Sequence, residues 1–410
     1  MNSLTGTEPD VTDGESRRVE FNFPILTVRT KWFGGVFDKL GALRVSRWVS
    51  WVSLFVVPIV AGLGLYSVCA SLLTLLWNPA AGEVIREIGL GVLIPFPGIN
   101  PVLPLLYGWF ALICAIAIHE GAHGIIARSL GLKVKSSGLL FFLFVPFGAF
   151  VEVDEEQLKK AQARVSSRVL AAGVGGNIAV ATVCLIGVLL IVGGLVPAFD
   201  GVYVYEVGGP AEAAGLLPKD VFVSVDNVWI NSTEDLRTVL DNRTSGDLVQ
   251  VTVARGDMWT SQFSTVVNLT SSENRTVMGV TVGDLMLEER LMYYQNVTLD
   301  KLTFYLVPPA FASGVVPFSD SLASFYTHWL GSQWHVLANV LFWLWFINVN
   351  VAVFNALPIY PLDGGRIFNV GLKRFIRRKE HEKLISAITM AVTAVVVLVL
   401  LLTLIMPFVT

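Results

Sequence analysis

Three residues suited to metal binding and proton transfer, His119, Glu120 and His123, lie in the otherwise apolar segment AIAIHEGAHGIIARSL. On a helix, His119 and His123 are four positions apart and face the same way, so both imidazoles can bind one metal ion. Glu120 is then beside the open coordination position. It is the only formally charged residue from 104 to 127, and an ionisable group at membrane depth is costly unless it has a partner or a task. Two histidines packed between helices are the alternative.

A metal-bound pair of histidines needs a third ligand, because a catalytic zinc usually takes three protein ligands and keeps one position for water. Asp363 is the best candidate, since it is an acid at membrane depth between two prolines and two glycines. A turn or helix-capping aspartate is the alternative. With zinc bound, Glu120 is expected to act as the base in amide hydrolysis. Asn177 and Asn355 could support the substrate carbonyl, and for Asn177 a bond across a helix interface is an equal alternative.

The composition is that of a membrane protein. Of the 410 residues, 54% are hydrophobic and 15% are charged, whereas a soluble protein is about one quarter charged. The net charge of −3 gives no indication of nucleic-acid binding. Cys69, Cys114 and Cys184 lie singly in apolar runs, which argues against a disulfide framework or a cysteine metal site. Residues 1–20 are polar, so we expect no cleavable signal peptide.

We expect a polytopic α-helical membrane protein with five spans, or six if the proline-rich segment 302–319 crosses rather than lying at the interface. Basic clusters beside the spans place the N-terminus in the cytosol. The histidine motif and Asp363 then lie near the cytosolic ends of two inward-running spans, at similar depth. The predicted spans are 48–77, 104 to about 128, 169–199, one within 321–362 that ends near 355, and 384–408.

A short apolar segment at 139–158 is broken by proline and glycine, so it is predicted to form a hairpin that dips back toward the histidine motif. An open strand edge inside a membrane is costly unless another chain pairs with it, and an extended substrate could be that partner.

Residues 200–290 alternate apolar and polar side chains in short runs, which predicts a soluble, mostly-β domain inserted between the membrane halves. Five of the six asparagines between 200 and 300 begin an N-x-S/T triplet, and such triplets accept glycans outside the cytosol. The domain is therefore predicted to be extracytosolic, although threonine-rich strands could produce the triplets by chance. The five are Asn231, Asn242, Asn268, Asn274 and Asn296.

The predicted division of the chain has four parts. They are 1–47, a polar tail with a basic flank; 48–199, the first membrane half; 200–290, the β domain; and 291–410, the second membrane half.

Several motifs occur together in one order. HEGAHG stands at 119–124, AAGVGGN ends at Asn177, AEAAGLLPKD lies in the β domain, and NALP precedes LDGG at 362–365. In this combination the chain resembles the site-2 proteases, which are intramembrane zinc metalloproteases. The resemblance covers about 48–408. One departure is Val174, where the family usually has proline.

The resemblance implies one zinc ion per chain, held by His119, His123 and Asp363, with Glu120 as the catalytic base. It implies single-span membrane proteins as substrates, cut within or beside their spanning helix, often after a first cut by a site-1-type protease. The expected setting is a lipid bilayer, most simply the cell membrane, with the active site near the cytosolic face.

Two further segments resemble parts of such proteases. GPAEAAGL at 209–216 is similar to the helix-entry signature of a PDZ domain, which implies screening of substrates on the outer side. PFGAFVE at 146–152 resembles the membrane-associated β-loop that pairs with substrate, which makes Gly148 and Phe150 candidate substrate contacts. The groove loop of the PDZ-like domain is expected at 199–202, next to the membrane.

Three other classes compete with a protease. A catalytically inactive scaffold or receptor would bind partners through the PDZ-like domain, but the intact Glu120 argues against it, since that residue contributes little to holding zinc. A prenyl-protein endopeptidase takes its third ligand from a glutamate on a later helix, and the later predicted spans contain none. A transporter is the weakest candidate, because no paired inverted repeats are visible.

Overall fold

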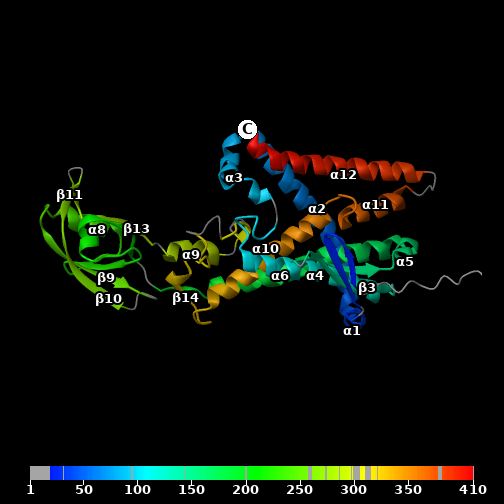
Figure 1. Ribbon diagram of the computed structural model, residues 1–410, viewed down its shortest axis with the longest axis horizontal. Coiled ribbons are helices and arrows are strands. Elements are labelled where there is room, and N and C mark those ends of the chain that lie inside the picture. Colours follow the sequence, from blue (N-terminus) through cyan, green and yellow to red (C-terminus); the bar gives the residue numbers. More distant parts are fainter. Residues whose placement is uncertain are drawn as a thin grey trace, which may run out of the picture. The chain divides into compact units, whose positions relative to one another are not determined.

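The computed structural model of the chain forms two compact units (Figure 1). Unit 1 comprises Met1–Thr182 and Leu344–Thr410, and unit 2 comprises Val183–Trp343. The division falls within two long helices, and each unit is described by itself. The residues described are 19–30, 32–93, 96–143, 145–198, 201–256, 261–272, 275–285, 287–296, 298, 305–309, 315–320, 322–376 and 381–409.

Five helices in the described part of the chain are long and apolar enough to cross a membrane, which confirms the predicted number. Uncharged apolar runs of this length become helices because a helix satisfies every backbone polar group internally, as a bilayer requires. The described parts of 302–319 add no further spanning helix. The five are α2 Arg44–Trp77, α4 Leu105–Ser129, α6 Ala163–Gly193, α10 Trp334–Ala356 and α12 Glu382–Ile405.

Small residues bring α2, α6 and α10 close together in unit 1. Val57, Ala171, Val174 and Ala352 are buried in one shared cluster. Gly175 of α6 lies so near Ser53 of α2 that an added Cβ would overlap the serine side chain. The small-residue run of α6 therefore serves helix packing, as its composition predicts.

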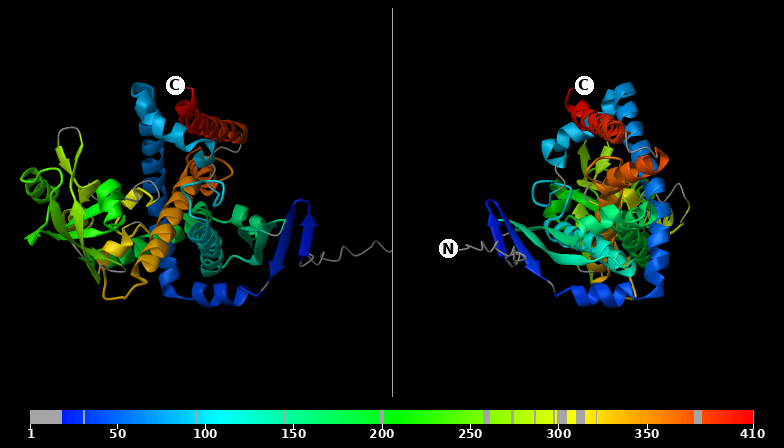
Figure 2. Two further views of the ribbon diagram at one scale, coloured as in Figure 1. Left: turned by 60° about the vertical axis from the view of Figure 1, so that its left-hand side comes forward. Right: turned by 90° about the vertical axis from the view of Figure 1, so that its right-hand side faces the viewer.

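A four-stranded antiparallel sheet in unit 1 has the order β1-β2-β3-β4. The hairpin predicted from 139–158 is present as β3 and β4, and β4 packs along α4. The N-terminal hairpin of β1 and β2 was not predicted from the sequence; Figure 2 shows it followed by α1 and the start of α2. The bounds are β1 Val19–Asn22, β2 Ile25–Thr30, β3 Val134–Phe142 and β4 Val145–Val153.

Shorter helices complete unit 1. Helix α1, Gly34–Gly41, packs on α4, where Phe37 is buried against Gly124. Helix α5, Glu155–Lys160, follows β4, and the backbone N–H of Gln157 donates to the carboxylate of its cap residue Asp154. The others are α3 Glu83–Ile88, α11 Asp363–Phe375, and 3-10 turns at Pro79–Gly82, Leu90–Leu93 and Met406–Phe408.

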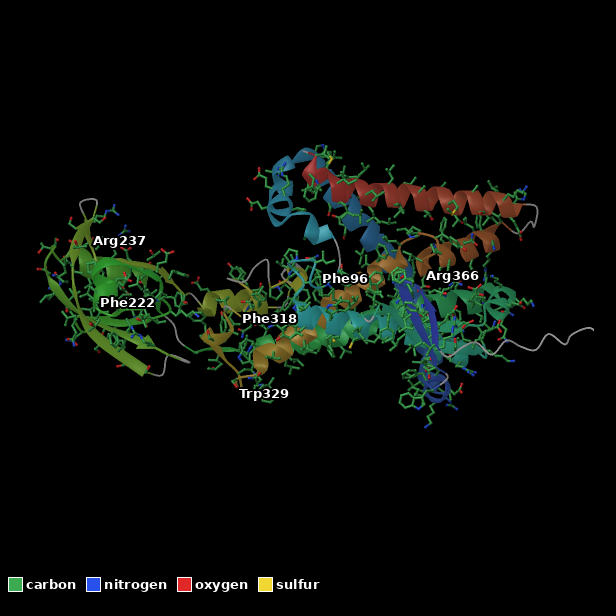
Figure 3. All side chains as sticks on the ribbon, viewed as in Figure 1. Phe96, Phe222, Arg237, Phe318, Trp329 and Arg366 are labelled. Atoms are coloured by element: carbon green, nitrogen blue, oxygen red, sulfur yellow. The ribbon has the colours of Figure 1, made fainter. Side chains whose placement is uncertain are left out.

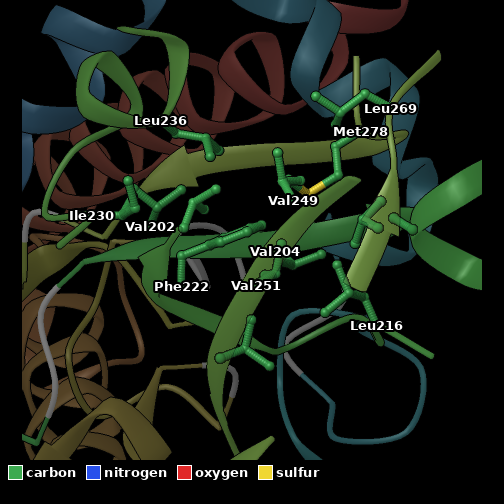
Figure 4. Close-up of a cluster of buried hydrophobic side chains, with 14 residues drawn as sticks. Val202, Val204, Leu216, Phe222, Ile230, Leu236, Val249, Val251, Leu269 and Met278 are labelled. Carbon is green, nitrogen blue, oxygen red and sulfur yellow. The ribbon is translucent and has the colours of Figure 1, made fainter. Parts of the chain in front are cut away.

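Unit 2 contains the predicted mostly-β region. Its main sheet has the order β10-β9-β7-β6-β13, and β8 pairs with β7. Alternate residues of the strands point inward and form one core, which Figure 4 shows around Phe222 and Val251. The strands are β6 Val202–Val207, β7 Val221–Val225, β8 Val228–Trp229, β9 Leu248–Arg255, β10 Ser261–Asn268 and β13 Val280–Asp284. Also present are β5 Val196–Pro197 with β14 Tyr326–Thr327, β11 Thr270–Ser272 with β12 Arg275–Val277, α7 Gly209–Ala213, α8 Thr233–Asp241, α9 Leu287–Gln295 and a 3-10 turn at Ala323–Phe325.

An ion pair between Arg255 and the buried Asp220 stabilises the β region. The Arg255 guanidinium donates two hydrogen bonds to the Asp220 carboxylate, at 2.7 and 2.6 Å, and this carboxylate also accepts from the backbone N–H of Leu217. The Asp220 side chain is 1% exposed. Its hydrogen bond to Arg255 raises the pKa of the guanidinium.

The asparagines of the predicted glycan triplets can be placed in four of five cases. Asn231, Asn242, Asn268 and Asn296 are exposed, as a glycan acceptor must be, and Asn274 lies outside the described residues. The side of the membrane on which they lie stays a prediction.

Candidate active site

The structure brings His119, His123 and Asp363 together within unit 1. His119 and His123 lie one turn apart on α4, and Asp363 is the first residue of α11. The Asp363 Oδ2 atom is 3.1 Å from the Nε2 atom of each histidine, and the two Nε2 atoms are 3.4 Å apart. His119 and Asp363 are buried, at 7% and 9% exposure. Residues 240 positions apart thus point three ligand atoms at one place.

These distances fit a tetrahedral zinc site. Zinc bonds of about 2.0–2.1 Å at tetrahedral angles hold neighbouring ligand atoms about 3.3 Å apart. The three observed separations, 3.1, 3.1 and 3.4 Å, lie close to that value. Among the described residues, this is the one group of three or more histidine, cysteine or acidic side chains close enough to share an ion. Two imidazoles and one carboxylate also match the donor set of a catalytic zinc with an open position.

The orientation of His123 is set by a second contact. Its Nδ1 atom is 2.8 Å from the backbone carbonyl of Val169 on α6. Because a carbonyl oxygen can only accept, Nδ1 carries the hydrogen and Nε2 keeps a free lone pair for a metal. His119 has no such partner among the described residues, and its Nδ1 atom is buried. The ring of His119 is therefore oriented by packing and by the contact of its Nε2 atom with Asp363.

Glycine at 173 allows α6 to cross directly over the ligand atoms. A Cβ added to Gly173 would lie 2.6 Å from the Nε2 atoms of both His119 and His123. Real Cβ atoms do not approach other atoms so closely, so a side chain here would displace the imidazoles. Sequence reasoning missed Gly173 as a site residue. The available signal was the small-residue run AAGVGGN, because small side chains let helices approach closely.

The turn before α11 positions Asp363. Leu362 is the N-cap residue, so the carboxylate of Asp363 is free to contact the imidazoles rather than cap a helix. The backbone N–H of Tyr360 donates to Thr393 Oγ1 on α12 at 3.0 Å, which ties down the turn. Gly364 and Gly365 pack directly against the backbone of residues 356–360, where a Cβ would overlap it. The two glycines are thus needed for this close approach.

Glu120 lines the same cavity as the three ligand atoms but stands outside their cluster. The cavity has a volume of about 290 Å³, and residues 151–153 of β4 form part of its wall. The backbone N–H of Val151 donates to Glu120 Oε2 at 3.0 Å. That N–H points away from β3 and toward α4, so the edge of β4 that does not pair with β3 borders the cavity. Val151 is a second residue that sequence reasoning missed, because it acts through its backbone.

The four predicted supporting residues separate into two groups. Asn355 lines the cavity, and its amide donates to a backbone carbonyl one helical turn earlier. Asn177 is fully buried in α6, is absent from the cavity wall, and has no hydrogen-bond partner among the described residues. Gly148 and Phe150 lie on β4 beside the cavity-lining residues but do not line it, and the Phe150 ring lies under the Arg29 guanidinium at 5.3 Å.

Two histidines and one aspartate thus form a buried cluster that could hold a metal ion, with a glutamate on the same cavity and both histidines on a helix of membrane-spanning length. Residues 107–400 match peptidase family M50, and the chain belongs to this family. The match confirms the resemblance to site-2 proteases drawn from the motifs.

Two curated relatives are similar over most of the chain. An uncharacterized protein of Methanocaldococcus jannaschii is 24% identical over 392 residues, which covers 89% of this chain and 90% of that protein. A protein of Clostridium perfringens, named as a candidate zinc metalloprotease, is 26% identical over 313 residues, covering 69% of this chain and 92% of that protein. Among solved structures, a PDZ domain of an SdrC-like protein from Listeria monocytogenes matches 20% of this chain and 88% of its own, at 23% identity and a TM-score of 0.19.

Proposed function

We propose that this chain is a zinc-dependent intramembrane endopeptidase that hydrolyses peptide bonds in or next to the transmembrane segment of single-span membrane proteins. The proposal rests on one observation: ligand atoms of His119, His123 and Asp363 converge on one point beside Glu120. The two histidines and Glu120 lie on α4, a helix of membrane-spanning length. Membership of a peptidase family and the name of the Clostridium relative support it. One zinc ion per chain fits the single cluster in the described residues.

The residues divide the chemistry between them. Zinc bound at the cluster supplies a Lewis acid for the peptide carbonyl and lowers the pKa of water. Glu120 accepts a proton from the attacking water and gives it to the leaving amine as the peptide bond breaks. The Glu120 carboxylate is thereby returned to its ionised form. The Val151 N–H holds the Glu120 carboxylate at the cavity wall. Asn355, on the same wall, is placed to support the carbonyl.

The free edge of β4 suggests how a substrate reaches the ligands. A transmembrane helix hides its peptide bonds in its own hydrogen bonds, so a segment must become extended before it is cut. An extended segment that pairs with the edge of β4 would satisfy its backbone and lie beside the cavity. Gly148 and Phe150, farther along β4, would then contact the same segment.

We further propose that the β domain is PDZ-like, lies outside the cytosol and screens substrates, while the active site lies near the cytosolic face of the cell membrane. A groove of about 560 Å³ runs beside α8 and β13, the outermost strand of the sheet. Its wall includes Arg237, which Figure 3 labels, and Val282. A peptide end left by an upstream site-1-type protease could add there as a further strand.

Cleavage by a matched pair of variants tests the proposal. The full chain, purified in detergent, is incubated with a panel of single-span membrane proteins beside Glu120→Gln and Glu156→Gln. Both changes remove one carboxylate charge, but Glu156 is an exposed residue paired with Lys160. Loss of a general base typically costs 10²–10⁴-fold, so Glu120→Gln should reduce cleavage by about that factor with its zinc retained, and Glu156→Gln should cleave like wild type.

Equal cleavage by all three proteins would remove the enzyme hypothesis. A wild-type chain that binds zinc but cuts no member of the panel would favour the inactive scaffold instead.

A further inference from the structure

A second cavity of unit 1 has no part in the proposed hydrolysis. It has a volume of about 860 Å³ and is enclosed by α5, the start of α6 and α11. Four basic side chains line it, and Glu155 is the only acid among its described lining residues. The four are Lys159, Arg366, Lys373 and Arg374.

Three of these positive charges have no acidic partner. Glu155 Oε2 is 3.1 Å from Lys159 Nζ, so this lysine and glutamate offset each other. In the described part of the chain, no acidic group lies within ion-pair distance of the remaining three cations of this cavity. The pKa of the Glu155 carboxyl is held below its usual range, first by the hydrogen bond and charge of Lys159 and then by the charge of Arg366. The cavity therefore carries an excess of positive charge, which favours an anionic ligand.

The position of α11 brings this cavity to a bilayer surface. The helix joins α10 to α12, and each of these is long and apolar enough to cross the membrane. Because this 13-residue helix connects the ends of two candidate spans, we expect its C-terminal part, with Lys373 and Arg374, to lie near the lipid headgroups. Phe375, at the end of α11, is 89% exposed, as suits a side chain that enters the interface.

Part of the cavity wall is apolar. Leu158, Leu170 and Val370 line its inner side, and they belong to or pack against one buried cluster. A free phosphate ion would gain nothing from such a surface. A phospholipid would use both parts, because its headgroup is charged and its glycerol and acyl carbons are apolar.

We propose that this cavity is a binding site for an anionic phospholipid, with Arg366, Lys373 and Arg374 contacting the headgroup phosphate. Arg366 also lines the active-site cavity and lies one helical turn after Asp363; Figure 3 labels it on α11. A bound lipid therefore fixes the helix that carries the third metal ligand. The lipid site is a property of the folded chain and does not depend on its cleaving any substrate.

The test measures lipid binding by the full chain in detergent, with phosphatidylglycerol, phosphatidylcholine and inorganic phosphate as probes. The variant Lys373→Gln/Arg374→Gln removes two charges from the cavity. The control Lys39→Gln/Lys133→Gln removes two exposed charges of the same unit that lie outside it. Each basic residue near a headgroup contributes about fivefold in affinity, so the cavity variant should bind phosphatidylglycerol about 30-fold more weakly, and the control should bind like wild type.

Other outcomes would overturn the site. One is a loss of phosphatidylglycerol affinity in the control variant equal to that in the cavity variant. Another is wild-type protein that binds zwitterionic phosphatidylcholine as tightly as phosphatidylglycerol. The third is displacement of phosphatidylglycerol by inorganic phosphate at matched concentration. If the double variant does not fold, Arg374→Gln alone changes one exposed side chain and should still weaken binding about fivefold. Cleavage is not a readout here, so the lipid site and the protease proposal fail separately.

Discussion

The candidate metal site and the β region are held together by opposite means. In the β region, side chains such as Val202, Val251 and Phe222 fill space, and each one buried contributes about 1.5–3 kcal/mol. At the metal site, the absence of a side chain at Gly173 lets three polar atoms meet. The first arrangement is fixed by volume and repeats along each strand, whereas the second is fixed by close approach at single positions. Changes that add or remove few atoms should therefore act very differently in the two places.

Gly173→Ala should have the largest effect. The new methyl group would lie 2.6 Å from both Nε2 atoms, so the imidazoles must move apart and lose their shared geometry. Changes beside metal ligands typically cost 10–100-fold in affinity, and we expect zinc binding to weaken by at least about that factor. Zinc titration of the purified chain measures it.

Gly193→Ala is the matched control, because it lies on the same helix and an added Cβ meets nothing within 4 Å. Wild-type zinc affinity in Gly173→Ala would contradict the close approach of α6 to the ligands.

Asp220→Asn, in the β region, should have the next largest effect. It leaves the partly buried Arg255 guanidinium facing a neutral amide, which should destabilise this region by about 2–4 kcal/mol. Hydrogen exchange of β7 and β9 in the full chain should become faster, while zinc content stays at the wild-type level.

Asp226→Asn provides the comparison, since its pair with Arg243 is more exposed and should matter by about 1 kcal/mol or less. Loss of zinc from Asp220→Asn would contradict the prediction, because it would mean that zinc binding depends on the stability of the β region.

Ser232→Ala should have the smallest effect. Ser232 caps α8: its hydroxyl accepts from the Asp235 N–H, and the Asp235 carboxylate accepts from the Ser232 N–H. Loss of an N-cap hydroxyl costs about 1 kcal/mol, so exchange should rise in the first turn of α8 and nowhere in unit 1. Ser232→Thr, which keeps the hydroxyl, should show the hydrogen exchange of wild type. Unchanged exchange in the first turn of α8 in Ser232→Ala would mean that the hydroxyl does not stabilise this helix.

The membrane helices could be predicted because each depends on its own sequence. The span predicted at 104–128 is α4, Leu105–Ser129, almost to the residue. The third helix begins at Ala163 rather than 169. The prediction began the span after Arg168, but Arg168 is buried within the helix. It donates to Ser50 Oγ and lies 4.6 Å from the Trp51 ring, so a charge that would normally lie outside a span is held inside the helix.

The candidate site could be predicted only where a residue acts through its side chain. An acid after a long apolar run, such as Asp363, is conspicuous in a sequence, as are two histidines one turn apart. Val151 contributes a backbone N–H, which any residue type except proline could supply, and Gly173 is one of three glycines in a small-residue run that does not show which of them faces the site. The hairpin of β1 and β2 was missed for a related reason, because its partner strand β3 is more than 100 residues away.

The central claim is that Asp363 completes a zinc site with His119 and His123. The most direct measurement is the zinc content of Asp363→Asn and Glu120→Gln, purified side by side with wild type. We predict one zinc ion per chain in wild type and in Glu120→Gln, and little or none in Asp363→Asn. Full zinc content and unchanged affinity in Asp363→Asn would contradict the account.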